Sequence, residues 1–183
     1  MESDRDLVLA LRVRQPGAFD RLYAQYSDRI WCFLARLAGP AAADLFQETW
    51  LAAARHVHRL REDTLLLPWL FTIARNKHRN SLRAQARQER AFRDLAVPAS
   101  SQPVSVDEQV HTRKAVARAE AAFARLASAH REVLLLCVVE GVDTATVART
   151  LGCSEAVVRK RLSRARQELV RRCGRQASSG GEP

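Results

Sequence analysis

Apolar residues recur along much of this chain at intervals of three and four, the spacing that gathers them on one side of an α-helix. The clearest stripe consists of Phe19, Leu22, Tyr26, Ile30, Phe33 and Leu37, and the pair Gly39-Pro40 ends it. Similar patterns predict a short helix over 5–14, a third over 41–58, and a fourth that Thr64 caps and that continues to about residue 90. The first half of the chain is therefore predicted to be helical nearly throughout.

Residues 92–109 break this pattern, because they contain Pro98 and Pro103 among small polar residues and have no apolar stripe. Helical spacing then resumes at Val116, and the run 133–139, apolar on every face, predicts a buried helix, with a valine-rich strand as the alternative. The sequence thus predicts an all-α protein of two small helical domains. The predicted boundaries are 1–91 and 110–175 for the domains, 92–109 for a flexible linker between them and 176–183 for a disordered tail. Each domain is expected to bury its apolar faces by helix-on-helix packing.

The second domain has the pattern of a helix-turn-helix. Asp143 and Ser154 are good N-caps for helices over 144–151 and from 155 onward, and Gly152 suits the tight turn between them. The second helix carries an apolar stripe at Val158, Leu162, Ala165 and Leu169, and arginines and a lysine on its other faces. This arrangement is typical of a recognition helix in a DNA major groove, although a basic helix can also be a solvated face.

A second basic surface is predicted on the helix that follows Trp69. Arg75, Arg79, Arg83 and Arg87 lie four residues apart and so follow one slowly drifting stripe, with Asn76 and Asn80 beside it. A solvated face is again the alternative. Basic helices in both domains indicate two contacts with one polyanion.

Composition supports a polyanionic partner, because the net charge is +10 and the isoelectric point is about 10.6. A hydrophobic content of 47% excludes a disordered basic tail. The four cysteines show neither CxxC nor zinc-ligand spacing, so we expect reduced thiols, no metal and no cofactor. The acidic start and the lack of a long apolar run predict a cytoplasmic protein without membrane insertion.

Several segments resemble signatures of the extracytoplasmic-function (ECF) sigma factors of the sigma-70 family. Residues 44–50, DLFQETW, are similar to DLVQETF, and residues 59–64 and 69–76, RLREDT and WLFTIARN, are similar to RFRGDS and WLYRIARN. Residues 130–136, HREVLLL, and the basic run 159–166 resemble QREVLLL and VKSRLHRAR. The resemblance covers about 18–92 and 110–172, in the family's order and separation. The chain departs from it at 65–68, where an apolar Leu-Leu-Leu-Pro replaces a more polar stretch.

The resemblance implies a non-enzymatic promoter-specificity subunit whose partners are core RNA polymerase (β′ clamp helices and β flap), promoter DNA and, commonly in such proteins, an anti-sigma factor. It implies that Asp44, Leu45, Gln47 and Glu48 meet the clamp helices. It implies contacts to the −10 element from Arg61, Asp63, Arg75, Asn76, Arg79, Asn80 and Arg83, with a base captured by the loop over 61–67. For the −35 element it implies Ser154, Glu155, Val157, Arg159, Lys160 and Arg161, and the later arginine Arg164 is expected on phosphate.

Two other classes of protein fit the sequence less well. A helix-turn-helix regulator that does not bind polymerase explains the second domain but neither the 44–50 motif nor the second basic helix. A nuclease is disfavoured because the five histidines are dispersed and acids are sparse in the basic regions.

Overall fold

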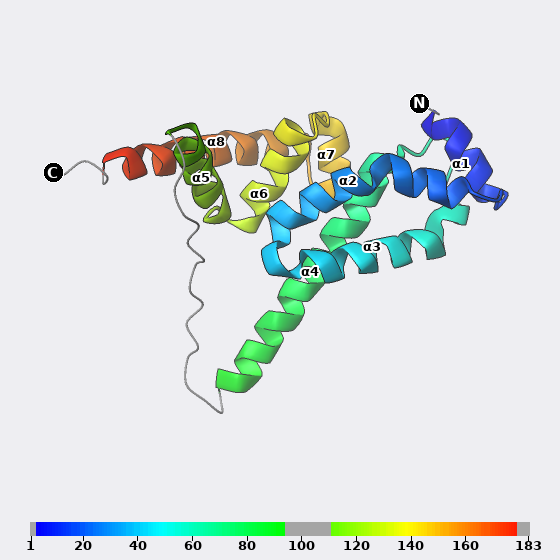
Figure 1. Cartoon of the computed structure of the whole chain (residues 1–183), viewed down its shortest axis with the longest axis horizontal. Coiled ribbons are helices and arrows are strands. Elements are labelled where there is room, and N and C mark those ends of the chain that lie inside the picture. Colours follow the sequence, from blue (N-terminus) through cyan, green and yellow to red (C-terminus); the bar gives the residue numbers. More distant parts are fainter. Residues whose placement is uncertain (1–2, 94–110, 179–183) are drawn as a thin grey trace.

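The computed structural model describes residues 3–93 and 111–178, and throughout these ranges the chain forms helices joined by turns (Figure 1). This confirms the all-α prediction. The first group of helices comprises α1 (Asp4–Arg12), α2 (Ala18–Ala38), α3 (Ala42–His56) and α4 (Leu66–Arg93), with short 3-10 turns at Gly39–Ala41 and Val57–Arg59. The second comprises α5 (His111–Ala124), α6 (Ser128–Leu134), a π-helical turn (Leu135–Val139), α7 (Thr144–Leu151) and α8 (Glu155–Ser178).

The core of the first group follows the apolar stripe of α2. Leu22, Ile30 and Phe33 are almost completely buried, and the rings of Phe33 and Phe71 lie 4.9 Å apart where α2 packs against α4. The helix begins after Gly17, which has a φ of +74° that side-chain-bearing residues rarely adopt. The predicted stripe thus fixes how α2 packs against its neighbours.

The start of α4 differs from the sequence prediction. The helix begins at Leu66 rather than directly after Thr64, with Pro68 in its first turn as predicted. The backbone N–H of Leu66 donates to the Asp4 carboxylate of α1, at 2.8 Å. The residue before the helix, Leu65, has no side-chain acceptor, so the orphan N–H takes its partner from another helix.

The helix-turn-helix is confirmed in detail. The Asp143 carboxylate accepts from the backbone N–H of Thr146 at 2.9 Å, and the Ser154 hydroxyl accepts from that of Val157 at 3.4 Å. Gly152 has a φ of +63° in the left-handed region that the turn requires. The predicted inner stripe of α8 is buried or half-buried, at Val158, Leu162, Ala165 and Leu169.

Two predictions need correction. The run 133–139 is helical, but it widens into a π-helical turn in which Val138 and Val139 are 52% and 51% exposed. A helix at the edge of a domain can bury only part of its circumference, so seven consecutive apolar residues cannot all face the core. The predicted tail begins too early, because α8 includes Gln176–Ser178, and α4 reaches Arg93 inside the predicted linker. The rest of that linker, 94–110, and the tail over 179–183 lie outside the described residues.

The two groups of helices pack against each other, α6 on α2 and α7 on α4 (Figure 1). One apolar core runs through both, from Leu22 and Leu70 of the first group to Leu136 and Leu151 of the second. The sequence predicted domains that bury their faces separately, and this contact was not foreseen. Its polar centre is an ion pair between Arg75 and Glu132, described below.

Candidate nucleic-acid and partner interfaces

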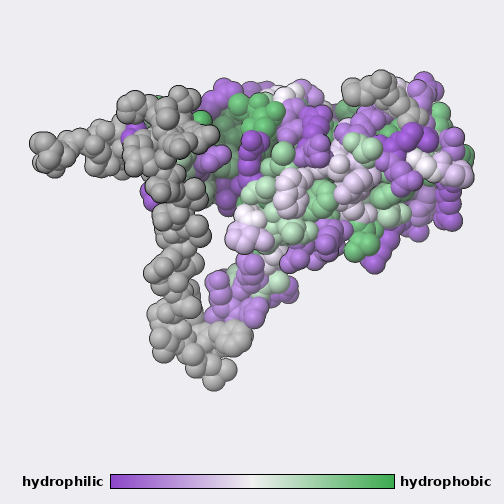
Figure 2. Space-filling view, viewed as in Figure 1, coloured by the Kyte–Doolittle hydropathy of each residue, from purple (hydrophilic) through white to green (hydrophobic). Residues whose placement is uncertain are grey.

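The basic surface of α4 lies on the part of the helix that extends away from the bundle, where hydrophilic residues predominate (Figure 2). Asn76, Asn80 and Arg83 are exposed and Arg79 is half-buried. An open groove of about 460 Å³ follows this part of the helix and is lined by Asn80, Arg83, Ala86, Arg87 and Arg90. The arginine stripe is therefore free to bind phosphates along most of its length.

Arg75 does not share this surface, although its sequence position continues the stripe. Only 7% of it is exposed, and its Nε donates to Glu132 Oε2 at 2.9 Å across the boundary between the two groups of helices. Its Nη1 also donates to the carbonyl of Thr150, at 3.4 Å. In this arrangement Arg75 stabilises the contact between the domains and cannot reach DNA.

The loop before α4 forms one wall of an open cleft of about 470 Å³. Arg61 and Asp63 are exposed and paired with each other, the Arg61 Nε lying 3.2 Å from Asp63 Oδ1. The cleft is lined on the loop and α4 side by Arg61, Asp63, Thr64, Leu65, Pro68, Trp69 and Thr72, and on the α7 side by Thr146, Arg149 and Thr150. Helix α7 of the second domain thus faces the loop that the resemblance assigns to base capture.

The recognition helix α8 presents its candidate residues to solvent. Ser154, Glu155, Val157, Arg159, Lys160 and Arg164 are exposed and Arg161 is half-buried. Glu155 Oε2 lies 3.1 Å from Arg159 Nη1 and so orients the guanidinium before any DNA is bound. The structure brings this whole set onto one helix, as the sequence predicted.

The polar side of α3 is also as predicted, with one correction. Asp44, Gln47 and Glu48 are exposed, and Glu48 Oε2 lies 3.2 Å from Lys77 Nζ of α4. Leu45 is only 3% exposed and belongs to the apolar core. It can support a partner surface from beneath but cannot touch the partner.

An exposed aromatic that packs against α3 was missed by sequence reasoning. Trp31 of α2 is 44% exposed, and its ring packs edge-on against Phe46 with centroids 5.5 Å apart. Tyr23, also partly exposed, packs on Trp50 at 4.8 Å. Trp31 and Tyr23 each directly follow an inward-facing residue of the stripe, Ile30 and Leu22. This position, off the buried stripe, could have identified them as exposed.

A buried histidine accompanies the ion pair at the domain boundary. Only 4% of His78 is exposed, and its Nε2 has no hydrogen-bond partner among the described residues. Burial lowers the pKa of His78 below its ordinary value, against the opposing effect of the Glu132 carboxylate. Burial thus disfavours a second positive charge on this ring beside the Arg75–Glu132 pair.

In the described ranges, no three acidic, histidine or cysteine side chains are grouped so that they could hold a metal ion. The same ranges include no helix of the length and apolar character needed to cross a membrane.

Models of two protein domains match the chain. Sigma-70 region 2 matches residues 22–88, and sigma-70 region 4 matches residues 117–169. The first range contains α3 and most of the basic face of α4, and the second contains the helix-turn-helix. The two matches therefore fall on the two groups of helices that carry the surfaces described above.

Proteins of similar sequence are sigma factors. The RNA polymerase sigma factor CarQ of Myxococcus xanthus is 33% identical over 156 residues, which cover 83% of this chain and 87% of CarQ. The ECF sigma factor EcfG of Rhodopseudomonas palustris is 34% identical over 140 residues, or 75% of each protein. The probable sigma factor RfaY of Xanthomonas campestris is 36% identical over 140 residues, but these cover only 35% of RfaY.

Solved structures share the fold. The sigma factor RpoE of Bartonella quintana, crystallised with the anti-sigma factor NepR, superposes with a TM-score of 0.70 at 22% identity, covering 85% of this chain and 96% of RpoE. CnrH in complex with the cytosolic domain of CnrY gives 0.67 at 21% identity, with 98% and 100% covered. With the two domain matches and the CarQ and EcfG relationships, the chain belongs to the ECF sigma factors of the sigma-70 family, non-enzymatic subunits that direct RNA polymerase to promoters for transcription initiation.

Proposed function

We propose a division of labour among three surfaces of this sigma factor: the polar side of α3 binds core polymerase, the loop and basic face of α4 open and hold the −10 element, and α8 reads the −35 element. The observation that carries the proposal is the simultaneous exposure of these three surfaces on elements that match the two sigma regions. The action takes place where polymerase and promoter DNA meet, in the bacterial cytoplasm.

For polymerase, the proposed contact is between Asp44, Gln47 and Glu48 and the β′ clamp helices, with the second domain resting on the β flap. Two carboxylates and an amide exposed on one side of α3 can pair with basic residues of a partner, and Trp31, exposed on α2 and packed against Phe46 of α3, offers apolar area.

Charge reversal on α3 tests this assignment. Asp44→Arg with Glu48→Arg is expected to weaken the complex with purified core polymerase at least tenfold, because like charges then face each other across the interface. Binding is measured with labelled sigma factor, and circular dichroism checks that helix content is intact. Asp20→Arg with Asp28→Arg, two exposed acids of α2, is the control with the same charge change. Unchanged affinity in the double variant would remove α3 from the polymerase interface.

For the −35 element, the first turns of α8 enter the major groove and the later arginines hold phosphates. Ser154 and Glu155 lie at the start of the helix, where backbone N–H groups and short side chains approach base edges, whereas Arg164 lies almost three turns further on. The pair between Glu155 and Arg159 sets the direction of a guanidinium that can bind a guanine.

Alanine substitutions on α8 should separate these two roles. Arg164→Ala is expected to flatten the log–log salt dependence of binding by about 0.9 for one lost phosphate contact, equally for every DNA sequence. Arg159→Ala or Arg161→Ala is expected to reduce discrimination between the −35 element and altered sequences by about 1–3 kcal/mol where the side chain reaches a base. Fluorescence anisotropy with duplexes over a range of salt concentrations measures both quantities. Equal, sequence-blind losses from all three variants would contradict the groove placement.

For the −10 element, the cleft beside Arg61 and Asp63 receives an unstacked base, and Asn76, Asn80, Arg79 and Arg83 hold the separated strand. Amide side chains can donate to and accept from a base edge, and the arginines neutralise phosphates. Arg75 joins this set only when the second domain leaves α4, since Glu132 otherwise occupies its guanidinium.

An anti-sigma factor is proposed as a further partner. The support is that RpoE and CnrH, whose folds this chain shares, are each bound to a second protein in their structures, which for RpoE is an anti-sigma factor.

A further inference from the structure

One carboxylate of α1 joins three helices of the first domain. Asp4 Oδ2 accepts the hydrogen bond from the backbone N–H of Leu66 described above, at the first residue of α4. Asp4 Oδ1 accepts a hydrogen bond from the hydroxyl of Tyr26 in α2. The same Tyr26 oxygen accepts from Gln25 Nε2 at 2.9 Å, which leaves the tyrosine proton for Asp4.

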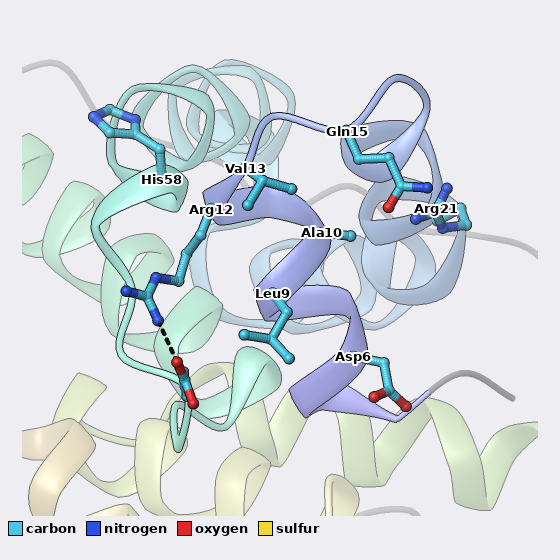
Figure 3. Close-up of a pocket in the computed structure, with 9 residues that line it drawn as sticks. Asp6, Leu9, Ala10, Arg12, Val13, Gln15, Arg21 and His58 are labelled. Atoms are coloured by element: carbon cyan, nitrogen blue, oxygen red, sulfur yellow. Dashed lines mark hydrogen bonds and ion pairs between the residues drawn. The ribbon is translucent and has the colours of Figure 1, made fainter.

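Helix α1 also holds the other end of the loop before α4. Glu62 Oε1 lies 2.9 Å from Arg12 Nη1, the contact marked by the dashed line in Figure 3, and Glu62 Oε2 lies 4.0 Å from Arg5 Nη2. Between these anchors the Thr64 N–H donates to the Arg61 carbonyl at 3.0 Å, which closes the loop as a turn. The loop that lines the cleft is thus fixed to α1 on both sides, at Glu62 and at Leu66.

The two anchors differ in strength. Arg5, Arg12 and Glu62 are all substantially exposed, so their ion pairs contribute little. Asp4 instead contacts a completely buried Leu66 and a Tyr26 that is 6% exposed. A carboxylate at a helix N-terminus also meets the positive end of the helix dipole. Asp4 therefore determines where α4 begins and, through it, the path of the loop.

We propose that Asp4 is a positioning residue for promoter opening: it fixes the first turn of α4 and so the shape of the cleft between Arg61 and Trp69 that receives the unstacked base. This inference rests on the base-capture function proposed above for that cleft. Asp4 is absent from the residues that line the cleft and acts on it through Leu66. This role cannot be predicted from the sequence, where Asp4 is one of two acids in the first turn of α1.

The test uses holoenzyme reconstituted with full-length variants. Asp4→Ala removes the acceptor, Asp4→Asn keeps an oxygen that can accept from Leu66, and Asp6→Ala is the matched control, an exposed acid of the same helix. The experiment measures the rate of open-complex formation on a duplex promoter and on promoters with each −10 base replaced in turn. It also measures the affinity for core polymerase. Asp4→Ala is expected to lower discrimination between the native and replaced bases by up to about fivefold, the factor by which loss of one N-cap acceptor typically destabilises the start of a helix. Core affinity and −35 binding should not change.

Asp4→Asn is expected to retain most of the discrimination between −10 bases. Because this variant keeps an acceptor oxygen but has no charge, its result separates the effect of positioning α4 from the effect of losing the charge. Tyr26→Phe, which removes the hydroxyl that orients the carboxylate but keeps the ring, should act in the same direction as Asp4→Ala, and it tests the proposal even where Asp4→Ala does not fold. Amide hydrogen exchange at Leu66 reports directly on the contact. Faster exchange with unchanged discrimination overturns the proposal.

The loop itself supplies the remaining control. Asp63→Ala alters the cleft without touching Asp4. If Asp63→Ala impairs opening while Asp4→Ala and Tyr26→Phe do not, the cleft works as proposed and Asp4 is not its positioning residue. If neither the cleft variant nor the Asp4 variants change opening or base choice, the base-capture function has failed, and this inference fails with it.

Discussion

Holoenzyme carrying Arg79→Ala and Asn80→Ala is expected to bind polymerase and the −35 element normally but to form no open complex on a duplex promoter. Extruding a base from the stack costs a few kcal/mol, which contacts to the separated strand must return. Asn80 is exposed beside the arginine groove of α4 and can pair with a base edge, while Arg79 lies half-buried next to it and can hold the backbone. Stacking on the apolar loop contributes about 1–3 kcal/mol per base, which does not by itself cover the cost for several bases.

Permanganate reactivity of unpaired thymines measures this opening directly. A promoter with a pre-melted bubble should partly restore transcription, because the cost of separating the strands has been removed in advance. Gln85→Ala with Gln88→Ala is the matched control, since both are exposed polar residues of the same helix. Normal opening rates in the Arg79/Asn80 variant would show that strand separation depends on another surface.

Glu132→Ala is expected to separate the two domains. It leaves the Arg75 guanidinium buried without its carboxylate, and breaking a buried ion pair in this way typically costs about 3–5 kcal/mol. The protein can avoid that cost by letting water reach Arg75, which requires α6 and α7 to move off α4. A second ion pair across the boundary, between Arg29 and Glu140, is partly solvated and contributes little.

Small-angle scattering should detect this separation as an increase in the radius of gyration. Glu155→Ala removes an exposed ion pair from the same domain and should leave the radius unchanged. Replacing both Arg75 and Glu132 with leucine should restore the compact form, because apolar residues can substitute for a buried pair that is removed as a whole. A Glu132→Ala protein as compact as the wild type would indicate that the apolar contacts between the domains suffice.

The elements that the sequence predicted well are those with short-range causes. The stripe of α2, the Asp143 and Ser154 caps and the Gly152 turn each depend on residues within a few positions of one another. The spacing of side chains along one helix therefore identified both the recognition helix and the polar side of α3.

The contacts that escaped prediction join residues far apart in the chain. Arg75 and Glu132 are 57 positions apart, and Asp4 and Leu66 are 62 apart. Nothing in the pattern around Arg75 distinguishes it from Arg79 and Arg83, because all three lie on one stripe and only the position of the second domain decides which is buried. Prediction from the sequence failed at Leu45 in a similar way. The motif around Leu45 resembles a partner-binding segment, but its position on the helix buries it in the core.

The ion pair across the domain boundary also restricts how the two regions of this chain can be exchanged with those of other sigma factors. Arg75 and Glu132 lie in separately matched regions, so a chimera that joins this region 2 to a foreign region 4 inherits the cation without its carboxylate unless the donor has an acid at the equivalent position. The reverse chimera inherits an unpaired buried acid. A chimera built from this chain should therefore carry Arg75 and Glu132 together, or replace both.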